Sequence, residues 1–417
     1  MRNSVDVMYR NGANRKNGSR QASPINFISA AARVKTSHRL TVGVVGCGYW
    51  GCKHIRILSG VPEVSRVAVI DLDARTREKI VASFPASSAY QDLDAALPHV
   101  DAVIVATPPE THCDVALKCL RAGKHVLLEK PIAKSVSEAL LLVEEARRSN
   151  LILMPGHTFE FNPALHELKR RIAEGELGRI HYIHSSRLNL GLYRRDVNVV
   201  WDLAPHDISI MNYLLDSVPS TVAGWASLNA GETEDVAFIR LEYREMGVTG
   251  FAHLSWLDPK KTREVTVVGS KKMAVYNDLV EEQLRIFDRG VIRPEESASF
   301  ERPLSCRYGD IISPRIDVKE PLALEVEHFV SCVHRGIAPK TAGESGLTVI
   351  VVLEAIDEAI ATGAAVNVRY PKHEDYARGH QGTYYSVLPA SACRSSWGSM
   401  LMTLSSDLST QSRPTRS

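Results

Sequence analysis

Residues Leu40 to Gly51 read LTVGVVGCGYWG, and this stretch decides the fold of the first part of the chain. Six mostly apolar residues, typical of a buried strand, lead directly into the spacing G-x-G-x-x-G. In a dinucleotide-binding turn the first glycine permits the tight turn, the second lets the backbone approach a diphosphate, and the third lets the next helix pack closely. We therefore expect a diphosphate at the N-terminus of that helix, near Gly46, Gly48, Tyr49, Trp50 and Gly51.

An acidic residue follows at the distance that this motif requires. A second predicted strand, Val64 to Ile70, ends at Asp71, 20 residues after Gly51. A carboxylate at this position accepts hydrogen bonds from ribose hydroxyls and would repel a 2′-phosphate. The next residue is Leu72 and not an arginine, so the sequence favours NAD over NADP. The alternative is a glycine turn in an unrelated α/β protein.

Strands and helices then alternate up to residue 157. Apolar runs predict strands over 101–107, 125–129 and 151–154, and helical patterns cover 73–84 and 110–121. Ser135 and Glu138 form a capping box that begins a further helix. This alternation predicts a doubly wound parallel sheet in a domain over 39–157, with ligands at the carboxyl ends of its strands.

The second half has a different pattern. β-branched and aromatic residues predict strands over 180–189, 221–229, 236–243, 248–256, 265–268 and 273–277, with few helices between them. Helices are predicted over 162–174, 322–334 and 346–361. We expect an α+β domain over 158–370, with a large, mostly antiparallel open sheet. The fold class is thus α/β with a second α+β domain.

The two ends are polar and lack periodicity, so we expect a disordered extension over 1–38 and a disordered tail over 371–417. The Arg- and Ser-rich N-terminal segment is also compatible with a transit peptide or with a start codon assigned too far upstream.

Composition narrows the class of protein. The chain has 417 residues, 44% hydrophobic residues and a net charge of +2, which is typical of globular domains. No apolar run is long enough to span a membrane, and the near-neutral charge gives no indication of nucleic-acid binding. The seven cysteines include no C-x-x-C pair, so we expect reduced thiols in the cytoplasm and no bound metal.

Glu129-Lys130-Pro131 closes a strand of the first domain. A lysine at the carboxyl end of a parallel strand points into the ligand crevice, where its ammonium can stabilise a developing alkoxide. Pro131 is a candidate for a cis peptide bond, which would fix the direction of Lys130. The alternative is a solvated lysine before a turn proline.

A second candidate lies in the stretch Trp201 to Leu215. Pro205 predicts the first turn of a helix, and this would place His206 near the positive end of the helix dipole. Such a histidine stays neutral and can act as a base near pH 7. Asp202 is close enough to orient the imidazole or to hold a substrate hydroxyl, whereas Asp207 should point away. The alternative is a structural histidine.

A third set ends the predicted strand over 101–107. Thr107 and Pro108 should lie beside the nicotinamide ribose, although this segment is also a helix-entry turn. Together the motifs predict cofactor contacts from Gly46, Gly48, Tyr49, Trp50, Gly51, Asp71, Thr107, Pro108, His112, Glu129 and Lys130.

With its glycine loop, E-K-P and D-x-x-x-H motifs in this order, the chain resembles the Gfo/Idh/MocA family of nicotinamide-dependent sugar oxidoreductases over about residues 40 to 370. The resemblance implies that Lys130 and His206 are the catalytic pair and that Asp202 assists. It also implies a homodimer or homotetramer that assembles through the open sheet.

A finer resemblance rests on the stretch Gly156 to Pro163, on 187–191 and on Asp196-Val197-Asn198. These are similar to the UDP-N-acetylglucosamine 3-dehydrogenase-like branch, which acts in the synthesis of surface polysaccharides. Glu160 departs from that pattern, where an apolar residue is usual. Arg187, Arg194 and Arg195 are compatible with a substrate diphosphate or, equally, with solvated loop residues. The implied substrate residues are Asn162, Arg187, Arg195 and Asn198.

These observations give one hypothesis and its alternatives. We expect an NAD-dependent dehydrogenase of a nucleotide-linked sugar, acting at C3. The first alternative is a dehydrogenase of a free polyol or sugar such as inositol. The others are a non-catalytic regulator that binds NAD or a sugar, and a structural subunit that presents an open sheet face.

Overall fold

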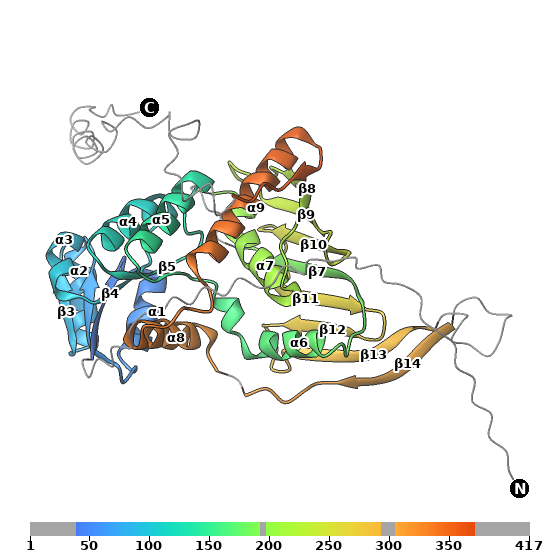
Figure 1. Cartoon of the computed structure of the whole chain (residues 1–417), viewed down its shortest axis with the longest axis horizontal. Helices are drawn as coiled ribbons and strands as arrows, with labels where there is room; N and C mark the ends of the chain where they lie inside the picture. The colour runs from blue at the N-terminus through green and yellow to red at the C-terminus, as the bar shows by residue number, and fades with distance from the viewer. Residues whose placement is uncertain (1–38, 192–196, 293–304, 318, 372–417) are drawn as a thin grey trace, which may run out of the picture.

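The computed structural model describes residues 39–191, 197–292, 305–317 and 319–371, and Figure 1 shows two sheet-containing parts side by side. The segments 1–38 and 372–417, expected to be disordered, lie outside the described residues. None of the helices in the described ranges combines the length and the apolar character that a bilayer crossing requires.

The first part contains a sheet of six parallel strands in the order β3-β2-β1-β4-β5-β6. The strands are β1 (Leu40–Val45), β2 (Val64–Ile70), β3 (Ser87–Tyr90), β4 (Ala102–Val105), β5 (His125–Leu128) and β6 (Leu153–Pro155). The order reverses between β1 and β4, which creates the crevice where doubly wound sheets bind ligands. The predicted parallel sheet is confirmed, although the sequence pattern did not predict the short, serine-containing β3.

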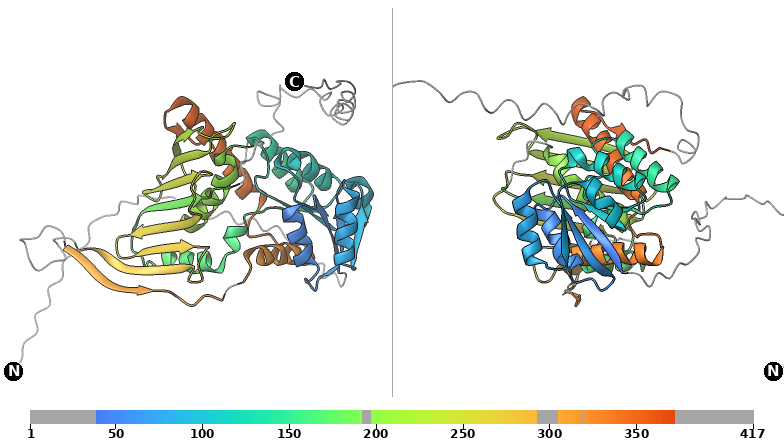
Figure 2. Two further views of the ribbon diagram at one scale, coloured as in Figure 1. Left: turned by 180° about the vertical axis from the view of Figure 1, so that it is seen from behind. Right: turned by 90° about the vertical axis from the view of Figure 1, so that its left-hand side faces the viewer.

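Helices cover both faces of this sheet (Figure 2). They are α1 (Tyr49–Leu58), α2 (Ala74–Ser83), α3 (Leu93–Ala96), α4 (His112–Arg121) and α5 (Val136–Arg148), with the 3₁₀ turns η1 (Leu97–His99) and η2 (Pro109–Thr111). Ser135 caps α5 as predicted, because its hydroxyl accepts the Glu138 backbone N–H at 3.2 Å. The Glu138 carboxylate accepts the N–H of Lys134 at 2.9 Å, one residue before the cap.

The second part contains nine strands in the order β14-β13-β12-β11-β7-β10-β9-β8-β15. They are β7 (Ile180–Leu188), β8 (Thr221–Ser227), β9 (Val236–Tyr243), β10 (Val248–Ser255), β11 (Thr262–Gly269), β12 (Met273–Asn277), β13 (Leu284–Ile292), β14 (Ser305–Ile312) and β15 (Val366–Asn367). Among the described strands of this second sheet, β7 and β10 pair in parallel and the other pairs are antiparallel, so the predicted sheet type is confirmed.

Four helices and the 3₁₀ turn η3 (Thr158–Phe161) join the two sheets. The helices are α6 (Pro163–Ala173), α7 (Val199–Leu215), α8 (Pro321–Arg335) and α9 (Gly343–Thr362). Figure 2 shows α7 and α9 on the side of the nine-stranded sheet that faces the first part. The chain also returns to the first sheet, because Val326 and Phe329 of α8 share a buried core with Val42 of β1. Strands of a parallel sheet are apolar on both faces, so both faces must be covered by helices. Helix α8, from the C-terminal part of the chain, helps to cover one face of the first sheet.

Candidate active site

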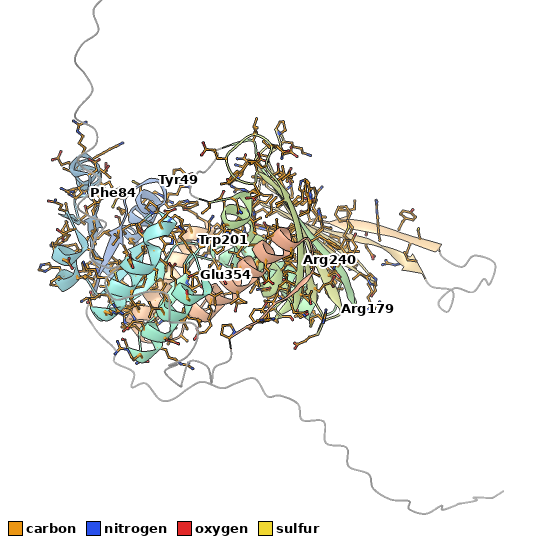
Figure 3. The ribbon with its side chains drawn as sticks, turned by 90° about the horizontal axis from the view of Figure 1, so that it is seen from above. Tyr49, Phe84, Arg179, Trp201, Arg240 and Glu354 are labelled. Atoms are coloured by element: carbon orange, nitrogen blue, oxygen red, sulfur yellow. The ribbon has the colours of Figure 1, made fainter. Side chains whose placement is uncertain are left out.

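The amine of Lys130 meets the first turn of α7 at the boundary between the two sheets. Lys130 follows β5, and its Nζ donates a hydrogen bond to the backbone oxygen of Asp202 at 2.7 Å. The same Nζ lies 3.5 Å from the Asp202 carboxylate. The side chains are 14% and 17% exposed, so they meet in a partly desolvated place. Figure 3 shows the neighbouring Trp201 between the two parts of the molecule.

The structure corrects the expected start of the helix that carries His206. Helix α7 begins at Val199, and Pro205 lies inside it and not in its first turn. Asn198 decides the start, because its side chain accepts the Trp201 backbone N–H at 3.0 Å and so forms the N-cap. Pro205 therefore only removes one internal hydrogen bond. The helix dipole is strongest in the first turn, so it does not account for a neutral His206.

Burial is the main reason why His206 is neutral. Desolvation lowers its pKa well below the usual value, and the positive charges of Lys130 and Arg187 lower it further. The ring of Phe159 packs against the imidazole with a centroid separation of 5.0 Å. The Nδ1 atom is buried and has no hydrogen-bond partner among the described residues. The expected base is thus neutral near pH 7, but for a different physical reason.

Two aspartates flank His206 in the sequence and have different partners. Asp202 accepts a hydrogen bond from the Trp256 indole N–H at 3.3 Å. Asp207 is buried and forms a two-point pair with Arg187, at 2.9 and 3.0 Å. The Asp207 carboxylate therefore has Arg187 as its partner, and that it points away from the imidazole stays a prediction. Arg187, predicted to bind a substrate diphosphate, directs two guanidinium donors to Asp207 and stacks on Phe159.

The other predicted substrate residues cap helices or lie outside the described residues. Asn162 is the N-cap of α6, and its amide also donates to the Tyr276 hydroxyl at 2.9 Å. Asn198 caps α7 and donates to Glu234 at 3.3 Å. Arg195, like its neighbour Arg194, lies outside the described residues. Substrate contacts by these residues stay predictions.

The glycine loop has the three distinct environments that the motif requires. Gly46 has φ +82°, a left-handed conformation that favours glycine. A Cβ on Gly51 would lie 2.0 Å from the Gly46 carbonyl oxygen, so α1 packs closely against the turn. A Cβ on Gly48 would meet no atom within 4 Å. The open side of Gly48, at the N-terminus of α1, fits the diphosphate of a dinucleotide.

Asp71 and two aromatic residues flank this loop. The Asp71 carboxylate accepts the Cys47 backbone N–H at 2.7 Å, which ties the end of β2 to the loop and fits a ribose contact. Tyr49 and Trp50 begin α1 and are 72% and 45% exposed. The Lys53 ammonium lies over both rings, 4.2 and 4.7 Å from their centroids.

The segment after β4 is held to the segment after β5 by His112. Its two ring nitrogens lie 2.8 Å from the Thr107 carbonyl oxygen and 2.7 Å from that of Pro131. His112 is buried, so it positions the two loops at the carboxyl edge of the sheet. Pro108 leads into η2, and the predicted helix-entry turn is therefore present.

The carboxylate of Glu129, the residue before Lys130, is bound by other groups of the same chain. One carboxylate oxygen lies 2.8 Å from Nε2 of His54, a fully buried residue of α1. The other accepts the Lys130 backbone N–H at 3.3 Å. The Lys130–Pro131 peptide bond is cis, as predicted. Sequence reasoning assigned no role to His54, because its partner is 75 residues away in the chain.

The sequence motifs did not indicate His157 as a site residue. It follows β6, it is 2% exposed, and neither ring nitrogen has a partner among the described residues. A lone histidine after a strand gave no signal beyond its place in the quoted stretch. The described residues hold no group of three or more His, Cys, Asp or Glu side chains arranged to bind a metal.

Two family models match the chain. Residues 40–157 match the model described as "Oxidoreductase family, NAD-binding Rossmann fold". Residues 165–275 match the GFO/IDH/MocA C-terminal domain. The part of the chain that contains the first sheet is therefore an NAD-binding Rossmann domain, in agreement with the predicted cofactor.

Curated relatives and solved structures give the same assignment. Inositol 2-dehydrogenase 2 of Saccharopolyspora erythraea is 35% identical over 49% of this chain, and the matching part covers 63% of that relative. The NAD⁺-dependent scyllo-inositol 2-dehydrogenase of Bacillus subtilis is 27% identical, with coverage of 72% and 88%. The structure of UDP-N-acetylglucosamine 3-dehydrogenase from Acidithiobacillus ferrooxidans has a TM-score of 0.64 at 23% identity, with coverage of 78% and 98%, and shows a shared fold.

Proposed function

The chain belongs to the GFO/IDH/MocA family of oxidoreductases, and from this premise we propose that it oxidises a secondary hydroxyl group of a sugar or cyclic polyol with NAD⁺. The observation that carries this proposal is the hydrogen bond of 2.7 Å between Lys130 and Asp202. It brings the amine of the NAD-binding domain to the helix that holds the neutral His206. NAD⁺, when bound, supplies the hydride acceptor.

The three side chains have separate roles in this proposal. His206 accepts the hydroxyl proton, because burial keeps its imidazole neutral near pH 7. Lys130 donates a hydrogen bond to the substrate oxygen and stabilises the alkoxide that develops there. Asp202 holds the Lys130 ammonium and is placed to bind a second substrate hydroxyl. The arrangement orients both reactants in one crevice, which supplies part of the rate.

Two substrate classes are supported by different observations. The motifs around Gly156 to Pro163 favour a nucleotide-linked sugar oxidised at C3, and the neighbour from A. ferrooxidans shares this fold. The named inositol dehydrogenases among the relatives favour an unmodified cyclic polyol. The pairing of Arg187 with Asp207 also favours the polyol, because this guanidinium already has a carboxylate partner.

A panel of substrates tests the function and separates the two classes. Purified protein is mixed with NAD⁺ and either myo-inositol, scyllo-inositol or UDP-, GDP- and dTDP-linked sugars, and NADH absorbance is followed. Turnover on the inositols alone selects the free polyol, and turnover on UDP-sugars alone selects the nucleotide-linked class. A protein that binds NAD⁺ but turns over no member of the panel would instead be a non-catalytic regulator.

We also propose that the open sheet face forms a homo-oligomer. Aromatic side chains of β7 to β10 are exposed on it: Tyr182 41%, Trp225 56%, Phe238 49% and Phe251 40%. Contiguous exposed apolar groups of this kind mark protein–protein contacts. Light scattering should report a dimer or tetramer, and Trp225→Glu together with Phe238→Glu should shift it toward the monomer.

A further inference from the structure

Buried polar atoms without partners are concentrated around one place. The described residues contain seven such side-chain atoms, and five belong to His54, His157, His206 and Glu325. An unpaired buried polar atom costs about 1–3 kcal/mol, so folded proteins contain few of them. A cluster of five is therefore best explained by a function that these residues share.

The segment Gly156 to Phe159 links the two catalytic halves. A Cβ on Gly156 would lie 3.3 Å from the Glu129 carboxylate, so this residue packs directly behind Lys130. Thr158 donates a hydrogen bond to Glu325 at 2.9 Å, and Phe159 packs against the His206 ring. His157 lies between these contacts and is only 2% exposed. Its imidazole is therefore enclosed in the interior, near enough to His206 to lower the pKa of that residue.

His206 needs an acceptor on its buried side. A neutral imidazole carries its proton on one nitrogen and a lone pair on the other, and the partner of one nitrogen decides the state of the other. If His206 is to accept a substrate proton at Nε2, its Nδ1 must carry the hydrogen. The carboxylate that the sequence suggested for this role, Asp202, binds Lys130 and Trp256. Nδ1 has no partner among the described residues.

We propose that His157 accepts the Nδ1–H of His206 through one internal water and so keeps the Nε2 lone pair of His206 directed at the substrate hydroxyl. This inference rests on the proposed function, because it concerns the same base. His157 acts through His206 and does not touch the substrate, so it is a positioning residue. A buried water with two or more polar partners is a normal part of a protein interior.

The groups around His157 suit an acceptor. Burial lowers the pKa of His157 to about 4, so the ring is neutral at pH 7 and has one lone pair to offer. The Glu129 carboxylate lies near enough to oppose this shift. Burial and the nearby Glu129 carboxylate raise the pKa of Glu325 on α8 well above its usual value. The charges of Lys130, Arg187 and Arg263 act on His206, and Glu160 on η3 acts on Glu325.

The tautomer of His206 can be measured without a substrate. Nitrogen NMR of the ¹⁵N-histidine-labelled, unliganded protein at pH 7.5 distinguishes Nδ1–H from Nε2–H, and His206→Asn identifies the His206 signals. We expect Nδ1–H in the wild type and in His157→Gln, whose amide oxygen can accept. We expect a shift toward Nε2–H in His157→Phe, which cannot accept. Ser88→Ala, which removes another unpartnered buried oxygen far along the first sheet, should change nothing.

Kinetics give the second readout, with whichever substrate the panel identifies. His157→Phe should lower kcat by roughly 10- to 100-fold, the size expected for a misdirected base, while NAD⁺ affinity is kept. His157→Gln should recover most of the loss. An unchanged His206 tautomer in His157→Phe would overturn the inference. Absence of turnover in the wild type would instead contradict the proposed function. The two failures can be told apart, because the NMR measurement needs no substrate and no turnover.

Discussion

The ammonium nitrogen of Lys130 lies 2.7 Å from the backbone oxygen of Asp202, across the boundary between the Rossmann domain and the nine-stranded sheet. These residues are 72 positions apart in the chain. The contact fixes where the end of β5 meets the first turn of α7. It therefore sets the distance between the proposed oxyanion stabiliser and the proposed base, His206.

Removal of the Lys130 charge should stop catalysis and preserve the cofactor site. Methionine keeps the length of the side chain but cannot donate to an alkoxide, so Lys130→Met should lower kcat by roughly 10²- to 10³-fold. The Kd for NAD⁺, measured by calorimetry, should change less than about threefold, because the diphosphate and ribose contacts are elsewhere. Lys118→Met, an exposed lysine of the same domain, is the control. Wild-type turnover in Lys130→Met would contradict the role assigned here.

The depressed pKa of His206 predicts the acid side of the pH profile. A base is active above its pKa, and burial lowers that of His206 well below the ordinary value of 6.5. The value of kcat/KM for oxidation should therefore change little between pH 7.5 and 6.5. An exposed histidine would lose about half of its base form over this interval. A midpoint at or above pH 6.5 would show that His206 is not the buried neutral base.

The glycine loop allows a matched comparison of two alanine substitutions. A Cβ at Gly51 would lie 2.0 Å from the Gly46 carbonyl oxygen, so Gly51→Ala should displace α1 and lower the free energy of unfolding by about 1–3 kcal/mol or more. A Cβ at Gly48 projects into open space. Gly48→Ala should therefore keep the wild-type stability in urea unfolding and weaken NAD⁺ binding. The reverse pattern would exclude a diphosphate beside Gly48.

Local patterns predicted the elements whose burial is simple. The predicted strands Val236–Tyr243 and Met273–Asn277 match β9 and β12 to the residue, because their apolar residues face one continuous core. The hairpin of β13 and β14 was not predicted. It extends away from the body of the molecule (Figure 1), and its charged residues Arg285, Asp288 and Arg307 conceal the strand pattern. In the described part of the hairpin only Leu284 and Ile286, at the start of β13, are buried, and local propensity is weak where the rest of a strand has no buried face.

The same limit applies to the candidate site. Lys130 and His206 were selected because a strand-end lysine and a histidine in a D-x-x-x-H motif are visible along the chain. The partner of His54 and the enclosure of His157 depend on contacts between distant segments, so no local pattern reveals them. Pro205 was misleading because the stronger signal, the Asn198 cap, lies seven residues before it.

Breaking the buried pair of Arg187 and Asp207 should lower the free energy of unfolding far more than breaking a surface pair. Their side chains are 7% and 2% exposed, so removing one partner leaves an unpaired buried charge. Arg187→Met should lower the free energy of unfolding by about 3–5 kcal/mol. Lys118→Met, which breaks an exposed pair with Asp94, should cost at most about 1 kcal/mol. Urea unfolding measures both, and equal losses would show that the Arg187 pair is solvated.

Glu160 predicts a pH dependence of stability with a definite sign. Burial raises its pKa to about 7 in the folded protein, whereas its ordinary value is 4.5. The folded state therefore binds this proton more tightly than the unfolded state does. Its contribution to stability is fully present below about pH 4.5 and is lost as the pH rises through 7.

Glutamine at this position removes the titration but keeps the shape of the side chain. Glu160→Gln should exceed the free energy of unfolding of the wild type by about 1 kcal/mol at pH 5 and by about 3 kcal/mol at pH 7.5. Urea unfolding at pH 5, 6, 7 and 7.5 measures the difference, and Glu63→Gln, at an exposed position, is the control. A difference that is constant across this range would mean that the Glu160 carboxylate is hydrated in the folded protein. The buried position of η3 between α6, α7 and α8 predicts the opposite.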